Sequence, residues 1–194
     1  VLKQEKSDKI VAIGASTGGP EAVYKVIEKL PENYYGTIVT IHMPAGFTKS
    51  YAERLNRSCK MEVKEAEDGD KLYKGRVLIA PGDYHMYLKR RGTEFYVEVK
   101  KDPIYNHHRP AVDPMFFSAA DEAKEKLIAV ILTGMGRDGA EGIEEIKKGG
   151  GHTVAQDEKS SVVFGMPKAA IESGKIDKVL PLEEIGKYLV NLQK

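Results

Sequence analysis

Several features that define other classes of protein are missing from this sequence. Its 194 residues include one cysteine, Cys59, and no tryptophan. One cysteine cannot form an internal disulfide bond, which fits a reducing compartment, and we expect a cytoplasmic protein. No apolar run approaches the roughly 20 residues that a membrane-spanning helix needs, so no membrane insertion is expected. The first nine residues are charged and polar, unlike a secretory signal peptide.

An excess of charge of one sign is missing as well. Thirty Lys and Arg residues face 29 Asp and Glu residues, which gives a net charge of +1. A general nucleic-acid-binding protein is usually basic, so we expect no nucleic-acid partner. The length and the 41% of hydrophobic residues suit one globular domain with a sizeable core. We assign residues 10–194 to this domain and residues 1–9 to the end of an interdomain linker.

Short β-rich runs alternate with helical patterns along the whole chain. Apolar runs predict strands at residues 10–13, 37–41, 61–66, 77–80, 128–132, 153–155 and 179–180. Helical patterns cover residues 20–30, 48–57, 113–127, 140–148, 167–173 and 182–192. Residues 84–90 and 94–100 form an alternating pair around a turn, which predicts one antiparallel hairpin. The fold class is therefore α/β, with a predominantly parallel sheet flanked by helices in three layers.

The loop after the first predicted strand carries a serine between glycines. Its sequence is Gly14-Ala15-Ser16-Thr17-Gly18-Gly19-Pro20, which contains the G-x-S-x-G pattern of a nucleophile elbow. The helix that follows offers free N–H groups and a partial positive charge at its start. Two other interpretations stay open for this loop. Ser16 or Thr17 could cap the helix, or the glycines could cradle the phosphates of a dinucleotide.

Two further loops that follow strands carry a histidine and an aspartate. His42 ends the second strand, where a dinucleotide-binding protein would place an acidic residue. A neutral imidazole suits a general base, although a buried histidine bound to backbone is the alternative. Asp138 lies in the loop after the most apolar strand and could orient a histidine or cap the next helix. No cluster with metal-ligand spacing accompanies Asp138, so we expect no metal.

Ser16, His42 and Asp138 all follow predicted strands, so the three side chains can meet at one edge of the sheet. Taken together, the surrounding segments resemble the catalytic domain of the chemotaxis methylesterase (CheB) family. The resemblance covers residue 9 to the end of the chain. It rests on the segments Val11–Pro20, His42–Pro44, Ala80–Met86, Arg109–Phe116, Leu132–Gly139, Ala155–Glu158 and Gly165–Pro167.

The resemblance implies hydrolysis of glutamate γ-methyl esters, and deamidation of certain glutamines, on bacterial chemoreceptors. Ser16 would be the nucleophile, His42 its base and Asp138 the carboxylate that orients His42. In this arrangement we expect Asp138 to accept the Nδ1 proton of His42, which leaves Nε2 facing Ser16. Met135 would supply an oxyanion-binding backbone N–H, with Thr17 and Gly18 beside it. No cofactor is implied.

The implied partners are the cytoplasmic helices of methylated chemoreceptors and an N-terminal receiver domain in a longer protein. His85, His107 and His108 lie in segments that could line the site, where they would contact substrate or form structural hydrogen bonds. Two other functions stay open. The chain could be a nicotinamide-dependent oxidoreductase that uses the Gly14–Gly19 loop, or a receptor-binding module without catalysis.

Overall fold

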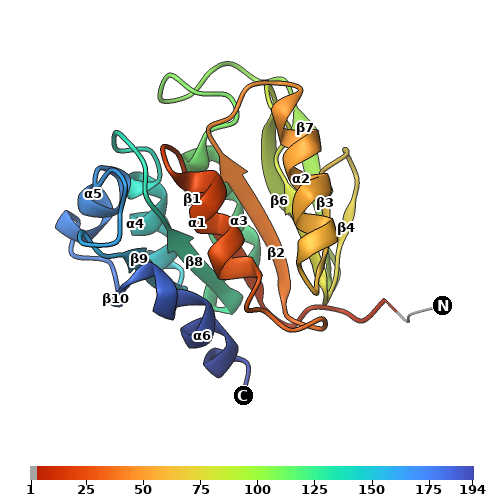
Figure 1. The fold of residues 1–194 in the computed structure, drawn as a ribbon. Helices are drawn as coiled ribbons and strands as arrows, with labels where there is room; N and C mark the ends of the chain where they lie inside the picture. Colours follow the sequence, from red (N-terminus) through yellow and green to blue (C-terminus); the bar gives the residue numbers. More distant parts are fainter. Residues whose placement is uncertain (1–3) are drawn as a thin grey trace.

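The computed structural model describes residues 4–194, and its centre is a seven-stranded sheet (Figure 1). All neighbouring strands of this sheet pair in parallel, in the order β10-β9-β8-β1-β2-β5-β3. The strands are β1 (Ile10–Ala15), β2 (Gly36–Ile41), β3 (Glu62–Glu65), β5 (Arg76–Ile79), β8 (Leu127–Ile131), β9 (His152–Gln156) and β10 (Lys178–Leu180). The predicted parallel sheet is confirmed, and β1 lies at its centre.

Helices cover both faces of the sheet, as the three-layer prediction requires. One face carries α1 (Gly19–Ile27), α2 (Phe47–Ser58) and α6 (Leu182–Leu192). The other carries α3 (Val112–Ala123), followed by a 3₁₀ turn at Lys124–Lys126, with α4 (Ala140–Lys148) and α5 (Met166–Glu172). Along β1, Val11 and Ile13 face the first layer, and Ile10 and Ala12 face the second. This alternation buries the strand on both sides.

A small antiparallel sheet packs over α3. Its main part is the predicted hairpin, formed by β6 (His85–Arg91) and β7 (Glu94–Lys100). Met86 and Leu88 of β6 are buried in the same core as α3. A further strand, β4 (Lys71–Leu72), pairs with the outer edge of β7. The sequence pattern did not predict β4, because two residues are too few to show a hydrophobic period.

The beginning of the described chain lies against the sheet. The buried hydroxyl of Ser7 accepts a hydrogen bond from the Gly36 N–H at 2.8 Å. The carbonyl of Glu5 accepts a hydrogen bond from the Lys74 N–H. The predicted linker, residues 1–9, includes residues 1–3, which lie outside the described residues.

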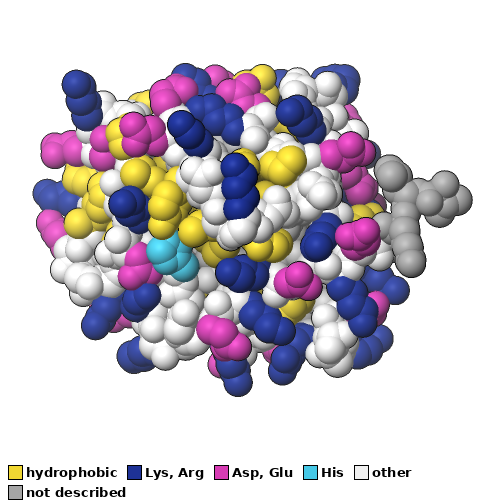
Figure 2. Space-filling model, turned by 90° about the horizontal axis from the view of Figure 1, so that it is seen from below, with side chains coloured by type: hydrophobic (Ala, Val, Ile, Leu, Met, Phe, Trp, Pro, Cys, Tyr) yellow, Lys and Arg dark blue, Asp and Glu magenta, His cyan; other side chains and the backbone are white. Residues whose placement is uncertain are grey.

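Figure 2 shows the face that holds the amino ends of the parallel strands. Basic and acidic side chains alternate over this face around a smaller apolar area, and neither sign of charge dominates it. Within residues 4–194, every helix is too short or too polar to cross a membrane.

Candidate active site

The strand order brings three polar loops together at the carboxyl edge of the sheet. β1 pairs with β2 on one side and with β8 on the other, so the loops after these strands are neighbours. The Ser16 N–H donates to the Thr133 carbonyl at 2.9 Å, which ties the serine loop to the loop after β8. The His42 N–H donates to the Ala15 carbonyl at 3.2 Å and extends the pairing of β1 with β2.

Ser16, His42 and Asp138 form one chain of hydrogen bonds. His42 Nδ1 lies 3.0 Å from Ser16 Oγ, and His42 Nε2 lies 2.6 Å from Asp138 Oδ2. The His42 and Asp138 side chains are only 6% and 3% exposed. A carboxylate can only accept, so Nε2 carries the proton of that bond and Nδ1 is free to accept the Ser16 hydroxyl. The neutral imidazole is therefore held in the tautomer that can remove a proton from serine.

The expected assignment of the two ring nitrogens is wrong. Nδ1 faces Ser16, and Nε2 faces Asp138. The reason lies in the strand order. His42 continues the strand next to Ser16, so the ring nitrogen nearer to its own backbone meets the serine. Asp138 follows β8, on the far side of β1, so the outer nitrogen reaches it. A histidine can use either nitrogen as the base, provided that the other one is bound.

Asp138 is held by four hydrogen-bond donors. Oδ2 accepts from His42 Nε2 and from the Val112 N–H at 2.7 Å. Oδ1 accepts from the Asp113 N–H at 2.9 Å and from Asn106 Nδ2 at 3.1 Å. Burial alone would raise the pKa of Asp138, but the bonds from His42 and from these backbone groups hold that pKa below its ordinary value. The carboxylate therefore stays charged beside the imidazole.

Asp138 does not cap the helix that follows it, which was one of the alternatives. The N-cap of α4 is Gly139, which makes no side-chain cap bond. The carboxylate instead binds the first N–H groups of α3, where a negative charge is favoured by the helix dipole. The aspartate thus stabilises a distant helix and orients His42 with the same two oxygens.

The segment between β7 and α3 supplies residues that the sequence reasoning missed or left open. The His108 ring stacks flat on the His42 ring, with centroids 3.5 Å apart and an angle of 8°. Burial, followed by the nearby His42, lowers the pKa of His108. Asn106 and Asp113 were missed as site residues, and only the density of polar side chains in residues 106–113 hinted at them. Burial raises the pKa of Asp113 to about 6.

Two backbone N–H groups near Ser16 are available to a ligand. Within residues 4–194, the N–H groups of Thr17 and Met135 have no hydrogen-bond acceptor. Gly134 allows this arrangement, because a Cβ there would lie 2.8 Å from Ser16 Cβ and 2.4 Å from Met166 Sδ. Donors of this kind can stabilise the oxyanion of an acyl-transfer reaction.

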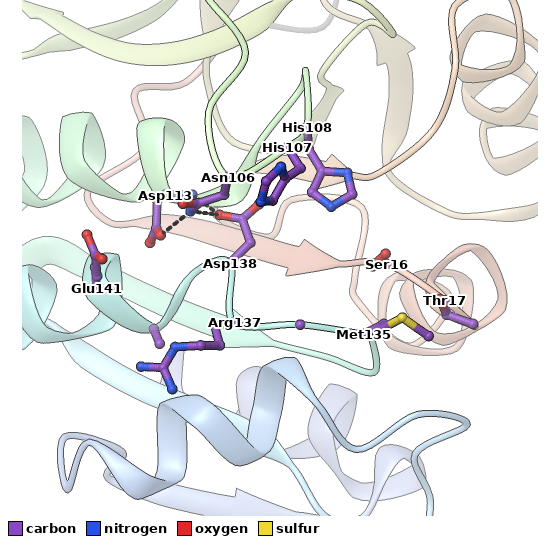
Figure 3. Close-up of a pocket in the computed structure, with 12 residues that line it drawn as sticks. Ser16, Thr17, Asn106, His107, His108, Asp113, Met135, Arg137, Asp138 and Glu141 are labelled. Carbon is purple, nitrogen blue, oxygen red and sulfur yellow. Dashed lines mark hydrogen bonds between the residues drawn. The ribbon is translucent and has the colours of Figure 1, made fainter.

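Ser16, Thr17 and Met135 line a cleft of about 590 Å³. Figure 3 shows the residues that line this cleft. Asn106, Asp113 and Asp138 form one cluster in this view, while Ser16, Thr17 and Met135 lie together at the other end. The lining residues are Ser16, Thr17, Asn106, His107, His108, Asp113, Met135, Gly136, Arg137, Asp138, Ala140 and Glu141.

Some predicted residues lie elsewhere or act differently. Gly18 does not line the cleft; it is the N-cap of α1, with a left-handed φ of 81°. No side chain caps α1, so neither Ser16 nor Thr17 is its cap. His85 is buried and structural, since its ring binds the Pro103 carbonyl and the Ala111 N–H. His107 does line the cleft. The described residues contain no group of three or more His, Cys, Asp or Glu that could hold a metal ion.

A serine, a histidine and an aspartate bonded in series at the carboxyl edge of an α/β sheet is the arrangement that serine hydrolases use. Comparison with known proteins identifies the family. The sequence model of CheB methylesterase matches residues 11–189, and the chain belongs to that family. The recognition drawn from the sequence motifs is thereby confirmed.

Individual relatives of the chain carry names that agree with this family. The chain is 50% identical over 188 residues, 97% of its length, to "Protein-glutamate methylesterase/protein-glutamine glutaminase 2" of Rhizobium johnstonii. It is 52% identical to "Protein-glutamate methylesterase/protein-glutamine glutaminase" of Pyrococcus abyssi, in an alignment of 200 positions that covers 98% of this chain. These matches span 52% and 54% of the two relatives, so the chain spans about half the length of the curated relatives it matches.

A solved structure supports the fold assignment. The crystal structure of the Thermotoga maritima CheB methylesterase catalytic domain superimposes with a TM-score of 0.92 at 48% identity. The match covers 95% of this chain and 98% of that structure. The α/β fold class expected from the sequence is confirmed by this similarity and by the observed sheet.

Proposed function

We propose that this chain hydrolyses γ-methyl esters of glutamate side chains, and deamidates certain glutamines, on bacterial chemoreceptors. One observation carries the proposal: His42 binds Ser16 Oγ through Nδ1 and Asp138 through Nε2. The family and the names of the relatives give the substrate class. This chain of bonds favours a hydrolase over a nicotinamide-dependent oxidoreductase, because the serine hydroxyl is bound to a base. It also disfavours a purely binding module.

The first half of the reaction forms an acyl-enzyme. Ser16 Oγ attacks the ester carbonyl carbon while His42 Nδ1 takes its proton, and Asp138 stabilises the imidazolium that forms. The backbone N–H groups of Met135 and Thr17 bind the oxyanion of the tetrahedral intermediate. When the intermediate collapses, the bond to the methoxy oxygen breaks, and the Nδ1 proton leaves with methanol.

The second half releases the product. Water attacks the acyl carbon, Nδ1 takes one of its protons, and the proton returns to Ser16 Oγ as the ester bond to the enzyme breaks. The products are a glutamate side chain with a free γ-carboxylate, still part of the receptor, and the original enzyme. A glutamine side chain passes through the same steps and releases ammonia. Gly18 contributes through the turn that presents Ser16, since its left-handed φ of 81° disfavours a side chain.

We also propose the setting of this reaction. The substrates would be the cytoplasmic helices of methylated chemoreceptors, so the chain would act in the cytoplasm. Residues 10–194 would be the catalytic domain and residues 1–9 the end of a linker from an N-terminal receiver domain. The length of the relatives supports such a second domain, because the chain spans about half of each.

The sharpest test removes the nucleophilic oxygen. Ser16→Ala should lower methanol release from methylated receptor fragments by about 10⁴–10⁶-fold, as in comparable triads. The thermal midpoint should change little. Ser58→Ala is the matched control, because Ser58 is exposed at the end of α2 and bonds only to its own helix. If Ser16→Ala kept more than about a tenth of the wild-type rate, the proposal would be wrong.

A further inference from the structure

The exposed segment before α3 places an amide between two buried carboxylates. Asn106 Nδ2 donates to Asp113 Oδ2 at 2.8 Å and to Asp138 Oδ1 at 3.1 Å (Figure 3). Counted over the whole residue, Asp113 is 1% exposed and Asp138 is 4% exposed. Both partners are acceptors, so only the NH₂ group of Asn106 can occupy this position, and it uses one hydrogen for each carboxylate.

The other groups around the two carboxylates show what Asn106 adds. Asp113 Oδ1 binds the Gly142 N–H at 2.7 Å, and Asp113's own N–H binds Asp138. These donors are backbone groups of α3 and α4, which the core holds in place. Asn106 is the one donor to Asp138 that comes from an exposed part of the segment between β7 and α3.

The local backbone explains how Asn106 reaches this position. Its φ is 51°, in the left-handed region that asparagine adopts more readily than most residues. Tyr105 and His108 exchange backbone hydrogen bonds across this turn. The turn therefore points Asn106 at Asp138 and lays the His108 ring on His42. One short segment contacts both the carboxylate and the imidazole.

We propose that Asn106 is a positioning residue, which holds Asp138 in line with His42 by bridging the Asp138 and Asp113 carboxylates. It acts through Asp138 and touches neither Ser16 nor His42. Without its hydrogen bond, the Asp138 carboxylate would be less neutralised and freer to turn. The negative charge of Asp138, no longer offset by the Asn106 amide, would then favour the protonated imidazole of His42, which cannot act as a base. This role rests on the proposed function, in which His42 is the base.

The charged and titratable groups that face this cluster are His42 from the loop after β2, Tyr105, His107 and His108 from the same segment, and Arg137 and Glu141 from the loop before α4 and from α4. None of them donates to Asp138 Oδ1 in the described chain. The effect of Asn106 can therefore be separated from theirs by substitution.

The experiment compares Asn106→Ala with Asn191→Ala, an exposed asparagine on α6 that serves as the matched control. We expect Asn106→Ala to lower kcat about tenfold, the effect of one lost hydrogen bond to a charged group, with KM within about twofold. The acid limb of the kcat profile and the NMR titration midpoint of His42 should both move to higher pH. Asn191→Ala should match wild type.

A second pair of variants separates this role from simple anchoring of the segment. Asn106→Asp should lose more activity at pH 8 than Asn106→Ala, because it places a third carboxylate beside Asp113 and Asp138. The double variant Asn106→Asp with Asp113→Asn restores a donor and an acceptor between positions 106 and 113, yet gives Asp138 no donor. Because it again holds only two carboxylates, we expect it to recover at most the activity of Asn106→Ala and to stay well below wild type.

Three results would overturn the inference. They are an unmoved His42 midpoint in Asn106→Ala, a change in KM alone, and recovery of wild-type activity in the double variant. The NMR titration needs no turnover, so it separates this inference from the proposed function. A wild-type chain without esterase activity whose His42 midpoint still moves in Asn106→Ala would reject the function and support the positioning role.

Discussion

At the scale of single residues, the Asp138 carboxylate both orients His42 and stabilises the N-terminus of α3. It binds the Nε2 proton of His42, and it accepts the first two N–H groups of α3. An aspartate that orients a histidine and an aspartate that caps a helix were alternatives when only the sequence was considered. In the structure Asp138 orients His42 and binds the start of α3 rather than the start of α4, the helix that follows it, because the N-terminus of α3 points at the edge where the three loops meet.

This double role changes what Asp138→Asn should do. An amide offers one acceptor oxygen, so its NH₂ group must face two of the four donors. We expect turnover at neutral pH to fall by roughly 10⁴, as when the triad aspartate of other hydrolases is replaced. Stability should also fall, by about 1–3 kcal/mol, because donors of α3 or His42 lose an acceptor.

Turnover and thermal unfolding of the Asp138→Asn variant check both parts of this expectation. Full activity combined with lowered stability would show that the residue only caps α3. Asp121→Asn serves as the control, because Asp121 is an exposed aspartate on α3. It shows how much replacing an aspartate on this helix changes turnover and stability by itself.

Asp113 predicts a pH dependence of stability. Its pKa in the folded protein, raised to about 6 by burial, exceeds the ordinary value of 3.8. The folded state therefore binds this proton more tightly than the unfolded state, and the free energy of unfolding falls as pH rises from about 4 to 6. A shift of about two units corresponds to roughly 3 kcal/mol.

Asp113→Asn removes this titration. The variant and the wild type can differ in their free energy of unfolding at pH 4 for other reasons. Between pH 4 and pH 7, however, the free energy of unfolding of the variant minus that of the wild type should rise by roughly 3 kcal/mol. Urea unfolding at several pH values measures it. A difference between the two proteins that stays constant over this range would contradict the raised pKa of Asp113.

At the scale of elements, the loop after β8 can approach the serine loop because Gly134 has no side chain. A Cβ there would lie 2.4 Å from Met166 Sδ and 3.0 Å from the Ser16 nitrogen. Gly134→Ala should therefore displace the loop that carries Met135. We expect kcat to fall on the order of 10²-fold, the cost of a displacement of about 1 Å at a reacting group.

The same substitution should lower stability by about 1–3 kcal/mol through overpacking. Gly149→Ala is the matched control, because a Cβ at position 149 meets its nearest neighbour at an ordinary 3.5 Å. Kinetics and thermal unfolding of both variants compare the two sites. Wild-type kcat in Gly134→Ala would show that the close approach is unnecessary for the reaction.

At the scale of the whole molecule, the proposed catalytic groups all come from strands and loops within this chain. Ser16, His42, Asp138 and the free N–H groups of Thr17 and Met135 are assembled in the absence of any other domain. The 194-residue chain should therefore release methanol from methylated receptors without phosphorylation. Assays with and without an added receiver domain test this, and activity that appears only with the receiver would contradict it.

Hydrophobic patterning along the chain was enough to predict the alternation of strands and helices, and with it the parallel sheet. It also determined that Ser16, His42 and Asp138 follow strands, so their meeting at one edge could be predicted. These features could be predicted because they depend on hydrophobic period and chain order, which are local properties. The motifs around these residues carried the family resemblance, which the comparisons confirmed.

Which atoms meet at the site depends on how distant segments pack together. β8 lies beside β1 although more than a hundred residues separate them in the chain, and this order brings Asp138 to the same edge as Ser16 and His42. The segment between β7 and α3 has no regular period, so its path could not be predicted. Its fold brings Asn106 to Asp138 and His108 to His42. Contacts of this kind depend on packing between distant segments, which no local pattern in the sequence encodes.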